Sequence, residues 1–257
     1  MTRSSTSAPT RWLIFPMAGL SERFARAGFT VPKYMLEAHG RSLFRHAVEG
    51  FLGHGGDMRL LFIARDVAET SAFIAAECRA MGVAAYDIHL LDAPTRGQAE
   101  TVALGLAGRI APDDAAMIFN IDTFRPHWRP PDGFALDAVD GYLEVFEGEG
   151  KNWSFVAPRD PAARTVARTT EKDPISNLCC TGLYYFRRAG DFVDAFAAAA
   201  AGGAASWSAG ELYVAPLYNR LIANGRDIRY HVIARDQVIF CGTPDEYQAV
   251  LAAPPGS

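Results

Sequence analysis

Residues 16–33, PMAGLSERFARAGFTVPK, combine a glycine-containing loop with several cations. Gly19 has no side chain, so the backbone N–H groups around it can approach phosphate oxygens closely. Arg23 suits a bidentate grip on a pyrophosphate, whereas Lys33 is a compact charge that can follow one phosphoryl group. A solvated surface loop with two ordinary basic residues explains the same composition equally well. The stretch predicts a phosphate-binding loop only together with other features.

Two later segments add groups that a bound nucleotide requires. Asp122 follows an apolar run, and a carboxylate at a strand end can hold Mg²⁺ beside a triphosphate, although such a residue more often caps a turn. Gly97 and Gln98 open a predicted helix, where Gly97 permits close approach and Gln98 offers both a donor and an acceptor to a nucleobase edge. A plain helix start with a glycine is the simpler interpretation of that pair.

A third group of polar residues lies in the second half of the chain. Glu171 can accept hydrogen bonds from acceptor hydroxyls, and Lys172 can bind an acceptor phosphate. An adjacent Glu-Lys pair is usually only a solvated ion pair. The run SNLCCTGLYYF at residues 176–186 follows directly. Each feature is weak by itself, and their order along one chain is more informative.

The first half of the sequence predicts elements that would bring these residues together. Short apolar runs alternate with segments of helical spacing, which is typical of a parallel sheet covered by helices on both faces. In an open α/β sheet, the loops at the carboxyl ends of the strands face the ligand. The predicted strands are 12–15, 59–64, 85–91 and 116–121, and the predicted helices are 42–52, 67–81 and 98–106.

The second half changes character, because strands follow one another with only turns between them. We expect strands at 139–146, 154–157, 166–170, 178–186, 228–233 and 238–240, and helices at 188–199, 211–224 and 244–251. The pattern predicts a leader at 1–10 and one α/β domain at 11–257, with a nucleotide-binding part at about 11–135 and an acceptor-side part at about 136–257. The expected fold is a mixed, mostly parallel sheet flanked by helices.

Composition narrows the classes of partner. The 257 residues are 49% hydrophobic and 21% charged, and 25 Lys and Arg against 29 Asp and Glu give a net charge of −4. A mildly acidic protein is a poor binder of nucleic acid, which requires a basic surface. The four cysteines lack zinc-ligand spacing, and no run is long and apolar enough to span a membrane. We therefore expect a cytoplasmic enzyme with buried, reduced cysteines.

From Leu13 to about Tyr247, these segments resemble the sugar nucleotidylyltransferases, or NDP-sugar pyrophosphorylases. Residues 18–23, AGLSER, and the later Pro32-Lys33 are similar to the family's A-G-x-G-x-R loop and its following lysine. Glu171-Lys172 and the run 176–186 are similar to the family's E-K element and its S-N-x-x-x-T-G-x-Y-x-F run, which is the most specific match. The resemblance implies a Rossmann-like, GT-A-type fold with a small acceptor lobe.

The resemblance also implies roles for particular residues. The catalytic residues would be Arg23 and Lys33, and Asp122 would bind Mg²⁺. The nucleotide-binding residues would be Ala18, Gly19, Leu20, Ser21, Gly97 and Gln98. The acceptor-binding residues would be Glu171, Lys172, Asn177 and Thr181.

Two positions depart from the family pattern. Ser21 stands where the loop has its second glycine, so a backbone conformation that needs a positive φ is less favourable there. Phe240 stands where the family often has a second metal-binding Asp, two residues before a Gly-Thr pair. Asp236 and Asp245 are the alternatives for that second ligand, and the sequence does not decide between them.

The implied activity is transfer of a nucleoside monophosphate from a pyrimidine NTP to a phosphorylated small acceptor, with release of pyrophosphate. A sugar 1-phosphate is the default acceptor, for surface polysaccharide precursors such as those of a capsule. The alternatives are a CTP-dependent cytidylyltransferase acting on a phosphorylated polyol, choline or amino-acid derivative, a glycosyltransferase of similar fold, and a non-catalytic nucleotide sensor. No nucleic acid or membrane partner is expected, and a homo-oligomer remains open.

Overall fold

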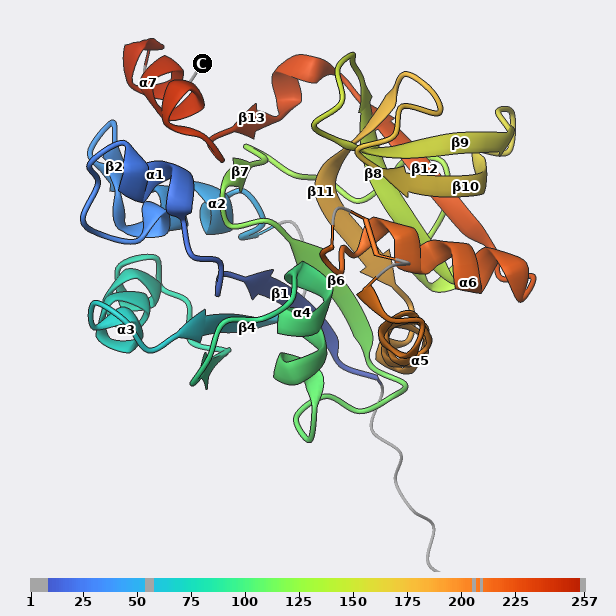
Figure 1. Ribbon diagram of the computed structural model, residues 1–257, viewed down its shortest axis with the longest axis horizontal. Helices are drawn as coiled ribbons and strands as arrows, with labels where there is room; N and C mark the ends of the chain where they lie inside the picture. Colours follow the sequence, from blue (N-terminus) through green and yellow to red (C-terminus); the bar gives the residue numbers. More distant parts are fainter. Residues whose placement is uncertain (1–8, 54–57, 205–206, 209, 255–257) are drawn as a thin grey trace, which may run out of the picture.

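The computed structural model describes residues 9–53, 58–204, 207–208 and 210–254, and a sheet of nine strands runs through them. The strand order is β5-β4-β1-β6-β11-β8-β12-β10-β9. Figure 1 shows this sheet extending from β4 and β1 on one side to β9 and β10 on the other. The predicted mixed α/β sheet flanked by helices is confirmed.

The first four strands of that order are parallel. They are β5 (Tyr86–Leu91), β4 (Met58–Arg65), β1 (Arg11–Pro16) and β6 (Ala115–Phe119), with β1 pairing β4 on one side and β6 on the other. The residues of β4, β1 and β6 are largely apolar because both faces of these strands are covered, whereas the edge strand β5 is only partly buried. All four predicted strands are confirmed within two residues. Their carboxyl ends meet at one edge of the sheet, where the polar loops of the sequence follow.

The other half of the sheet is largely antiparallel. It consists of β11 (Leu178–Phe186), β8 (Gly141–Glu147), β12 (Ile228–Ile233), β10 (Thr165–Glu171) and β9 (Ser154–Asp160). β11 joins the two halves, since it pairs antiparallel with both β6 and β8. Within β11 the register against β8 shifts between Cys180 and Tyr184, at the position of Gly182. This irregularity brings the middle of β11 to the carboxyl end of β6.

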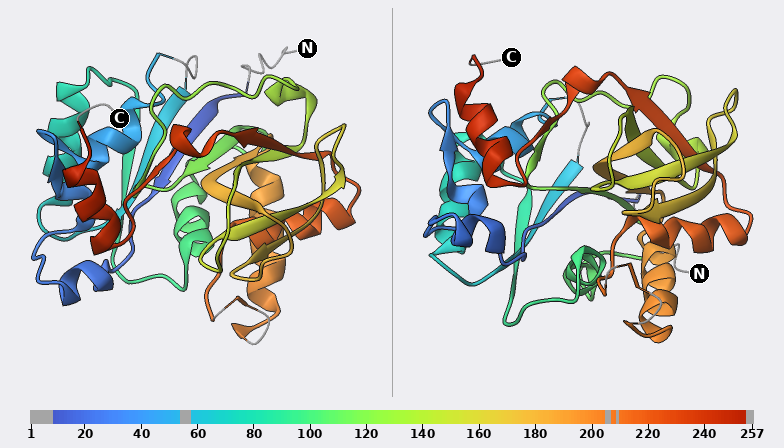
Figure 2. Two further views of the ribbon diagram at one scale, coloured as in Figure 1. Left: turned by 90° about the horizontal axis from the view of Figure 1, so that it is seen from above. Right: turned by 45° about the horizontal axis from the view of Figure 1, so that its top comes forward.

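Helices cover both faces of the sheet. Side chains of β1 alternate between them, with Trp12 and Ile14 in one buried cluster and Leu13 and Phe15 in the other. The first cluster includes residues of α4 (Gln98–Leu106), α5 (Ala189–Ala201) and α6 (Tyr218–Ala223). The second includes residues of α1 (Glu22–Arg26), α2 (Leu43–Glu49), α3 (Thr70–Ala80) and α7 (Pro244–Ala252). Figure 2 shows these two groups of helices from two further directions.

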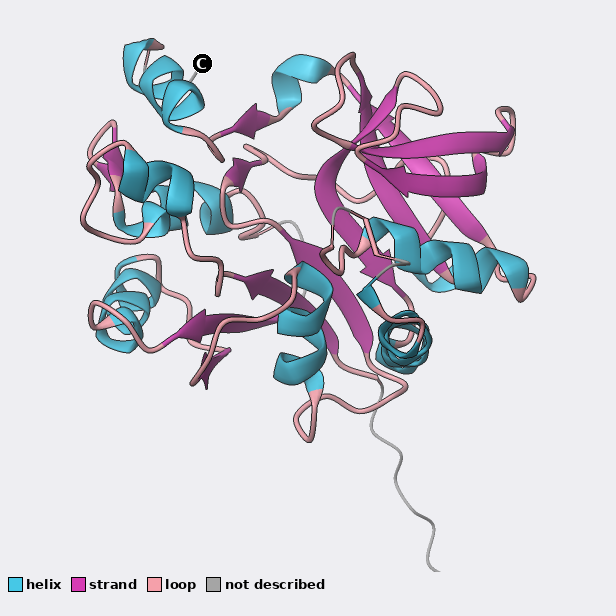
Figure 3. Cartoon of the chain, in the orientation of Figure 1, coloured by secondary structure: helices cyan, strands magenta, loops and turns pink. Residues whose placement is uncertain are grey.

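Short elements that the sequence did not predict lie around the carboxyl edge. They are the two-residue strands β2 (Glu37–Ala38), β3 (Arg41–Ser42) and β7 (Thr123–Phe124), and the 3-10 helix η1 (Lys33–Met35). β7 pairs with β13 (Ile239–Phe240), so the chain that follows Asp122 lies beside the chain that precedes α7. Figure 3 shows these short strands and the loops that connect them.

The prediction of a helix over 211–224 is wrong in its first half. The helical region begins with the 3-10 helix η4 (Ala215–Leu217) and continues as α6. Residues 211–213 are not helical: Pro216, at the start of η4, opposes a helical turn before it, and the Leu212 backbone hydrogen bonds to the start of α4 instead. A proline and a tertiary contact together outweigh the helical spacing here.

The remaining expectations concern cysteines and membranes. All four cysteines are buried and unpaired. Burial raises the pKa of the Cys78 thiol to about 12, so this residue acts as an apolar packing group. Among the described residues, every helix is too short or too polar to cross a membrane. Most of the predicted leader, residues 1–8, lies outside the described residues.

Candidate active site

The loop after β1 approaches the edge of the sheet and turns into α1. Ser21, the residue that caps α1, has φ 53° and ψ 33°. This is the left-handed region that residues other than glycine seldom adopt, and the serine adopts it although the sequence made a positive φ less favourable at this position. Ala18 is buried, whereas Gly19 and Leu20 are exposed. A Cβ added to Gly19 would meet nothing within 4 Å, so the space beside that backbone is open.

Lys33 and Asp122 form an ion pair at this edge. The Lys33 Nζ lies 2.5 Å from Oδ2 of Asp122, and the two side chains are only 20% and 22% exposed. The residues are 89 positions apart, and the structure brings them together because β1 and β6 are adjacent parallel strands. The predicted metal ligand and the predicted transfer-step cation therefore share one site.

A second carboxylate lies near Asp122, from a residue that the sequence did not suggest. A Cβ added to Gly242 would lie 3.0 Å from Oδ2 of Asp122 and 3.7 Å from Oε2 of Glu246. Oε2 of Glu246 accepts hydrogen bonds from the backbone N–H groups of Gly242 and Thr243, which caps α7. The sequence signal was the Thr-x-x-Glu capping pattern, which places this carboxylate beside the loop.

The positions considered for the second metal ligand are Asp236, Asp245 and Phe240. Asp236 and Asp245 are both exposed. Phe240 pairs with Thr123 in the short β7–β13 ladder, and its ring packs 4.5 Å from that of Trp153. Arg235 lies over the Phe240 ring at 5.0 Å. An aromatic and cationic surface therefore occupies the place where the family pattern has an acid.

The residues around Asp122 fit a magnesium ion. Among the described residues there is no group of three or more His, Cys, Asp or Glu side chains that could hold a metal by themselves. Mg²⁺ is ordinarily held by only one or two carboxylates together with water and substrate phosphates. The Asp122 carboxylate is partly exposed and already pairs with a cation, so it can serve as such a ligand.

Gln98 is oriented by a neighbouring amide. Its Nε2 donates to Oδ1 of Asn120 at 2.5 Å. Asn120 in turn lies against Gly182 of β11, where an added Cβ would be 2.4 Å from its Nδ2. These amide orientations follow from the hydrogen-bond network. Asn120 and Gly182 were not predicted as site residues, and they fix the amide that the sequence singled out.

Gly97 has a separate structural requirement. Its φ is 142°, and an added Cβ would lie 2.5 Å from the backbone oxygen of Leu212. The N–H of Leu212 donates to the carbonyl of Arg96 at 3.0 Å, and the N–H of Ala99 donates to the carbonyl of Leu212 at 2.9 Å. The start of α4 is therefore held against residues 211–213.

Glu171 and Lys172 lie at the end of β10 on the acceptor side. The Ser154 hydroxyl donates a short hydrogen bond to Glu171, and burial raises the pKa of the Glu171 carboxyl. Lys172 has φ 56°, and its Nζ donates to the Tyr213 hydroxyl at 2.6 Å. Burial raises the pKa of Tyr213, so its hydroxyl stays neutral beside the lysine. Arg23, the other predicted catalytic cation, lies on α1 and is exposed.

The two other predicted acceptor residues lie further along the same run. Thr181 is buried, and its hydroxyl donates to Oε1 of Glu144 at 3.0 Å. Glu144 is also buried and pairs with Arg125 at 2.7 Å. Asn177 is exposed, and its carbonyl accepts from the N–H of Gly148 at 2.9 Å. Thr181 thus belongs to a buried ionic network beside the site, and Asn177 to the turn before β11.

Several solved structures are similar to this chain over almost its whole length. The chain is 48% identical to the nucleoside-diphosphate-sugar pyrophosphorylase from Vibrio cholerae RC9, whose crystal structure superimposes with a TM-score of 0.88 over 94% of this chain and 100% of that one. It also resembles a UDP-glucose pyrophosphorylase complexed with UDP-glucose, with a TM-score of 0.76, 14% identity and coverage of 95% and 97%. The inositol-1-phosphate CTP transferase from T. maritima gives a TM-score of 0.70, 12% identity and coverage of 95% and 96%.

The two more distant structures share the fold of this chain. No protein-family model matches the chain, and no curated protein sequence does.

Proposed function

Because the chain belongs to the nucleoside-diphosphate-sugar pyrophosphorylases, enzymes that transfer a nucleoside monophosphate, we propose that it joins a pyrimidine NTP to a sugar 1-phosphate and releases pyrophosphate. The observation that carries this proposal is the ion pair of Lys33 and Asp122 at the carboxyl edge of β1 and β6. A cation for the α-phosphoryl group and a carboxylate for Mg²⁺ meet there at hydrogen-bonding distance.

The reaction is a single in-line displacement. An oxygen of the acceptor phosphate bonds to the α-phosphorus of the NTP, and the bond from that phosphorus to the β-phosphate oxygen breaks. The acceptor phosphate is already ionised, so no general base is required. Catalysis then depends on positioning and on stabilising charge in the transition state.

Each side chain has a proposed role in that displacement. Arg23 holds the leaving pyrophosphate, Lys33 contacts the α-phosphoryl group, and Lys172 binds the incoming phosphate. Mg²⁺ bound at Asp122 would neutralise negative charge on the triphosphate. Gln98, held by Asn120, faces the pyrimidine base, and the loop at Ala18–Ser21 offers its backbone N–H groups to the phosphates.

A second candidate is CTP-dependent transfer to a phosphorylated acceptor that is not a sugar. Two observations favour it. Glu171, the expected partner of sugar hydroxyls, already accepts a hydrogen bond from Ser154. The rings of Trp153 and Phe240, with Arg235 over the second, occupy the position of the family's second acid.

Pyrophosphate release from a matrix of substrates tests both candidates. ATP, GTP, CTP, UTP and dTTP are each combined with a sugar 1-phosphate, a polyol phosphate, phosphocholine and a phosphorylated amino-acid derivative. We expect pyrophosphate with a pyrimidine NTP and one acceptor class, and far slower release from Asp122→Asn. Release of a nucleoside diphosphate would indicate a glycosyltransferase, and nucleotide binding without turnover would indicate a sensor. Either result contradicts the proposal.

A further inference from the structure

Residues 211–213 contact both sides of the candidate active site. On the nucleotide side, the backbone of Leu212 makes two hydrogen bonds with the start of α4, to Arg96 and from Ala99. On the acceptor side, the hydroxyl of Tyr213 accepts a hydrogen bond from Lys172. Adjacent residues of one non-helical segment therefore touch the proposed base-binding helix and the proposed phosphate-binding lysine.

Tyr213 contacts Lys172 in two ways. The Lys172 Nζ lies 2.6 Å from the tyrosine oxygen and 4.8 Å from the centroid of the ring. Burial, and after it the nearby Glu211 carboxylate, raise the pKa of Tyr213 far above its usual value. The hydroxyl therefore stays neutral and can accept from Lys172.

The backbone of Lys172 is fixed as well. Its φ of 56° lies in the left-handed region, and its N–H donates to the carbonyl of Trp153 at 2.8 Å. A lysine has four rotatable side-chain bonds, and a fixed backbone alone leaves its ammonium free to move. Tyr213 restrains the far end of that side chain. An ammonium has three N–H donors, so the hydrogen bond to Tyr213 leaves two for a phosphate.

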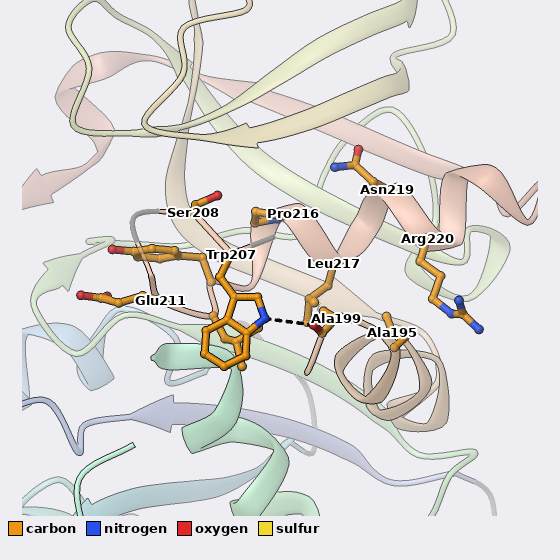
Figure 4. A pocket seen from close by; sticks show the side chains of 12 residues that line it. Ala195, Ala199, Trp207, Ser208, Glu211, Pro216, Leu217, Asn219 and Arg220 are labelled. Carbon is orange, nitrogen blue, oxygen red and sulfur yellow. Dashed lines mark hydrogen bonds between the residues drawn. The ribbon is translucent and has the colours of Figure 1, made fainter. Parts of the chain in front are cut away.

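The other side of residues 211–213 faces a cavity of about 380 Å³ between α5 and α6. Figure 4 shows this cavity, with Trp207, Leu217 and Ala199 around it and Glu211 at its margin. The indole N–H of Trp207 donates to the carbonyl of Ala199 at 3.0 Å. Leu212 itself is buried in the hydrophobic cluster beneath the sheet, so its burial and the hydrogen bonds of Leu212 and Tyr213 together hold the segment beside this cavity.

We propose that Tyr213 is a positioning residue that holds the Lys172 ammonium in place for the acceptor phosphate and, through Leu212, ties that ammonium to the base-binding helix. The inference rests on the proposed function of Lys172. It adds a residue that the sequence placed inside a helix and assigned no role.

Steady-state kinetics of four variants test this role. They are Tyr213→Phe, Lys172→Ala, the double variant, and Tyr86→Phe on β5 at the far end of the sheet as the matched control. We expect Tyr213→Phe to raise the acceptor KM about tenfold, with the NTP KM changed less than about twofold, because it loses a hydrogen bond to a charged group. Tyr86→Phe should match the wild type.

The double variant separates positioning from an independent contact. If Tyr213 acts through Lys172, the double variant has the same acceptor KM as Lys172→Ala alone. Full additivity of the two single effects overturns the proposal, as does an acceptor KM for Tyr213→Phe equal to that of the wild type. A shift of similar size in both substrate KM values indicates a general structural defect and also overturns it.

A readout without turnover separates this inference from the proposed function. Lysines carrying ¹³C-methyl labels are followed by NMR, and the Lys172 signal is assigned by its loss in Lys172→Ala. Tyr213→Leu should move that signal, because the ammonium no longer lies over an aromatic ring, whereas Tyr86→Phe should not. An unmoved signal shows that Tyr213 does not hold Lys172, whether or not the protein releases pyrophosphate.

Discussion

The start of α4 offers a matched pair of glycines for testing how the nucleotide side is built. Gly97 precedes the helix and Gly108 follows it, and both have positive φ, at 142° and 69°. An added Cβ at Gly108 meets nothing within 4 Å, whereas at Gly97 it falls 2.5 Å and 2.6 Å from the backbone O and N of Leu212. Changing each glycine to alanine therefore separates backbone strain from collision with Leu212.

The expected costs follow from this geometry. Gly108→Ala places an alanine in the left-handed region, which costs about 1–2 kcal/mol. Gly97→Ala places one at φ 142° and ψ 175°, a region open essentially only to glycine, at a cost of about 1–3 kcal/mol. Displacing Leu212 also disrupts its two backbone hydrogen bonds, each worth about 0.5–1.5 kcal/mol net. The free energy of unfolding should thus fall by about 4 kcal/mol in Gly97→Ala.

Thermal unfolding and nucleotide titration measure the two consequences. At about 2–4 °C per kcal/mol for a chain of this size, Gly97→Ala should lower Tm by about 12 °C and Gly108→Ala by about 4 °C. Calorimetry with the preferred NTP and Mg²⁺, below both transitions, should show affinity reduced about tenfold or more in Gly97→Ala, because Gln98 moves with the glycine. Equal Tm values and equal affinities in the two variants would refute the reasoning.

The other expectations concern single side chains of the site. Asp122→Asn should fold normally, with an unchanged far-UV circular dichroism spectrum, and its kcat at saturating Mg²⁺ should fall about 100-fold or more. EDTA should abolish the activity of the wild type. Lys33→Ala should lower kcat by about 10²–10³ with little change in KM, whereas Arg23→Ala should mainly raise the KM for NTP and for pyrophosphate in the reverse reaction. If Lys33→Ala raises only KM, its transition-state role is wrong. Gln98→Ala should weaken pyrimidine binding by about 1–3 kcal/mol in calorimetry, and tightest binding of a purine by the wild type would contradict the base assignment.

The pattern of apolar residues was sufficient to predict most strands of the sheet. The apolar runs of β1, β4 and β6 are short and continuous because both faces of these strands are buried, and that pattern depends on local sequence alone. β13 was predicted, as the strand at 238–240, but the two-residue strand β7 had no such signal. The two strands pair because the chain after Asp122 and the chain before Gly242 lie side by side, a long-range contact that no local pattern encodes.

The same distinction applies to the site. Arg23, Lys33 and Asp122 were identified by residue type and by family resemblance, and Lys33 and Asp122 lie together in the structure. Tyr213 was missed because residues 211–224 were given a helix on their spacing, whereas Pro216 and the contact of Leu212 with α4 start the helical region only at Ala215. The sequence made a positive φ less favourable at Ser21, because serine replaces the glycine of the family pattern, yet the structure has φ 53° there.

Several side chains proposed to contact substrate already have a partner in the protein. Lys33 pairs with Asp122, Lys172 donates to Tyr213, and the Gln98 amide donates to Asn120. A substrate must therefore exchange or share these bonds rather than find free groups, and an exchanged hydrogen bond contributes little net affinity. Each partner instead restricts the orientation of a flexible side chain and so keeps it near the geometry that the transfer reaction requires. Of these three, only the bond between Lys33 and Asp122 joins two groups of opposite charge that both have proposed roles toward the triphosphate. Binding of the NTP with Mg²⁺ should accordingly separate that pair, while Lys172 and Gln98 keep their partners.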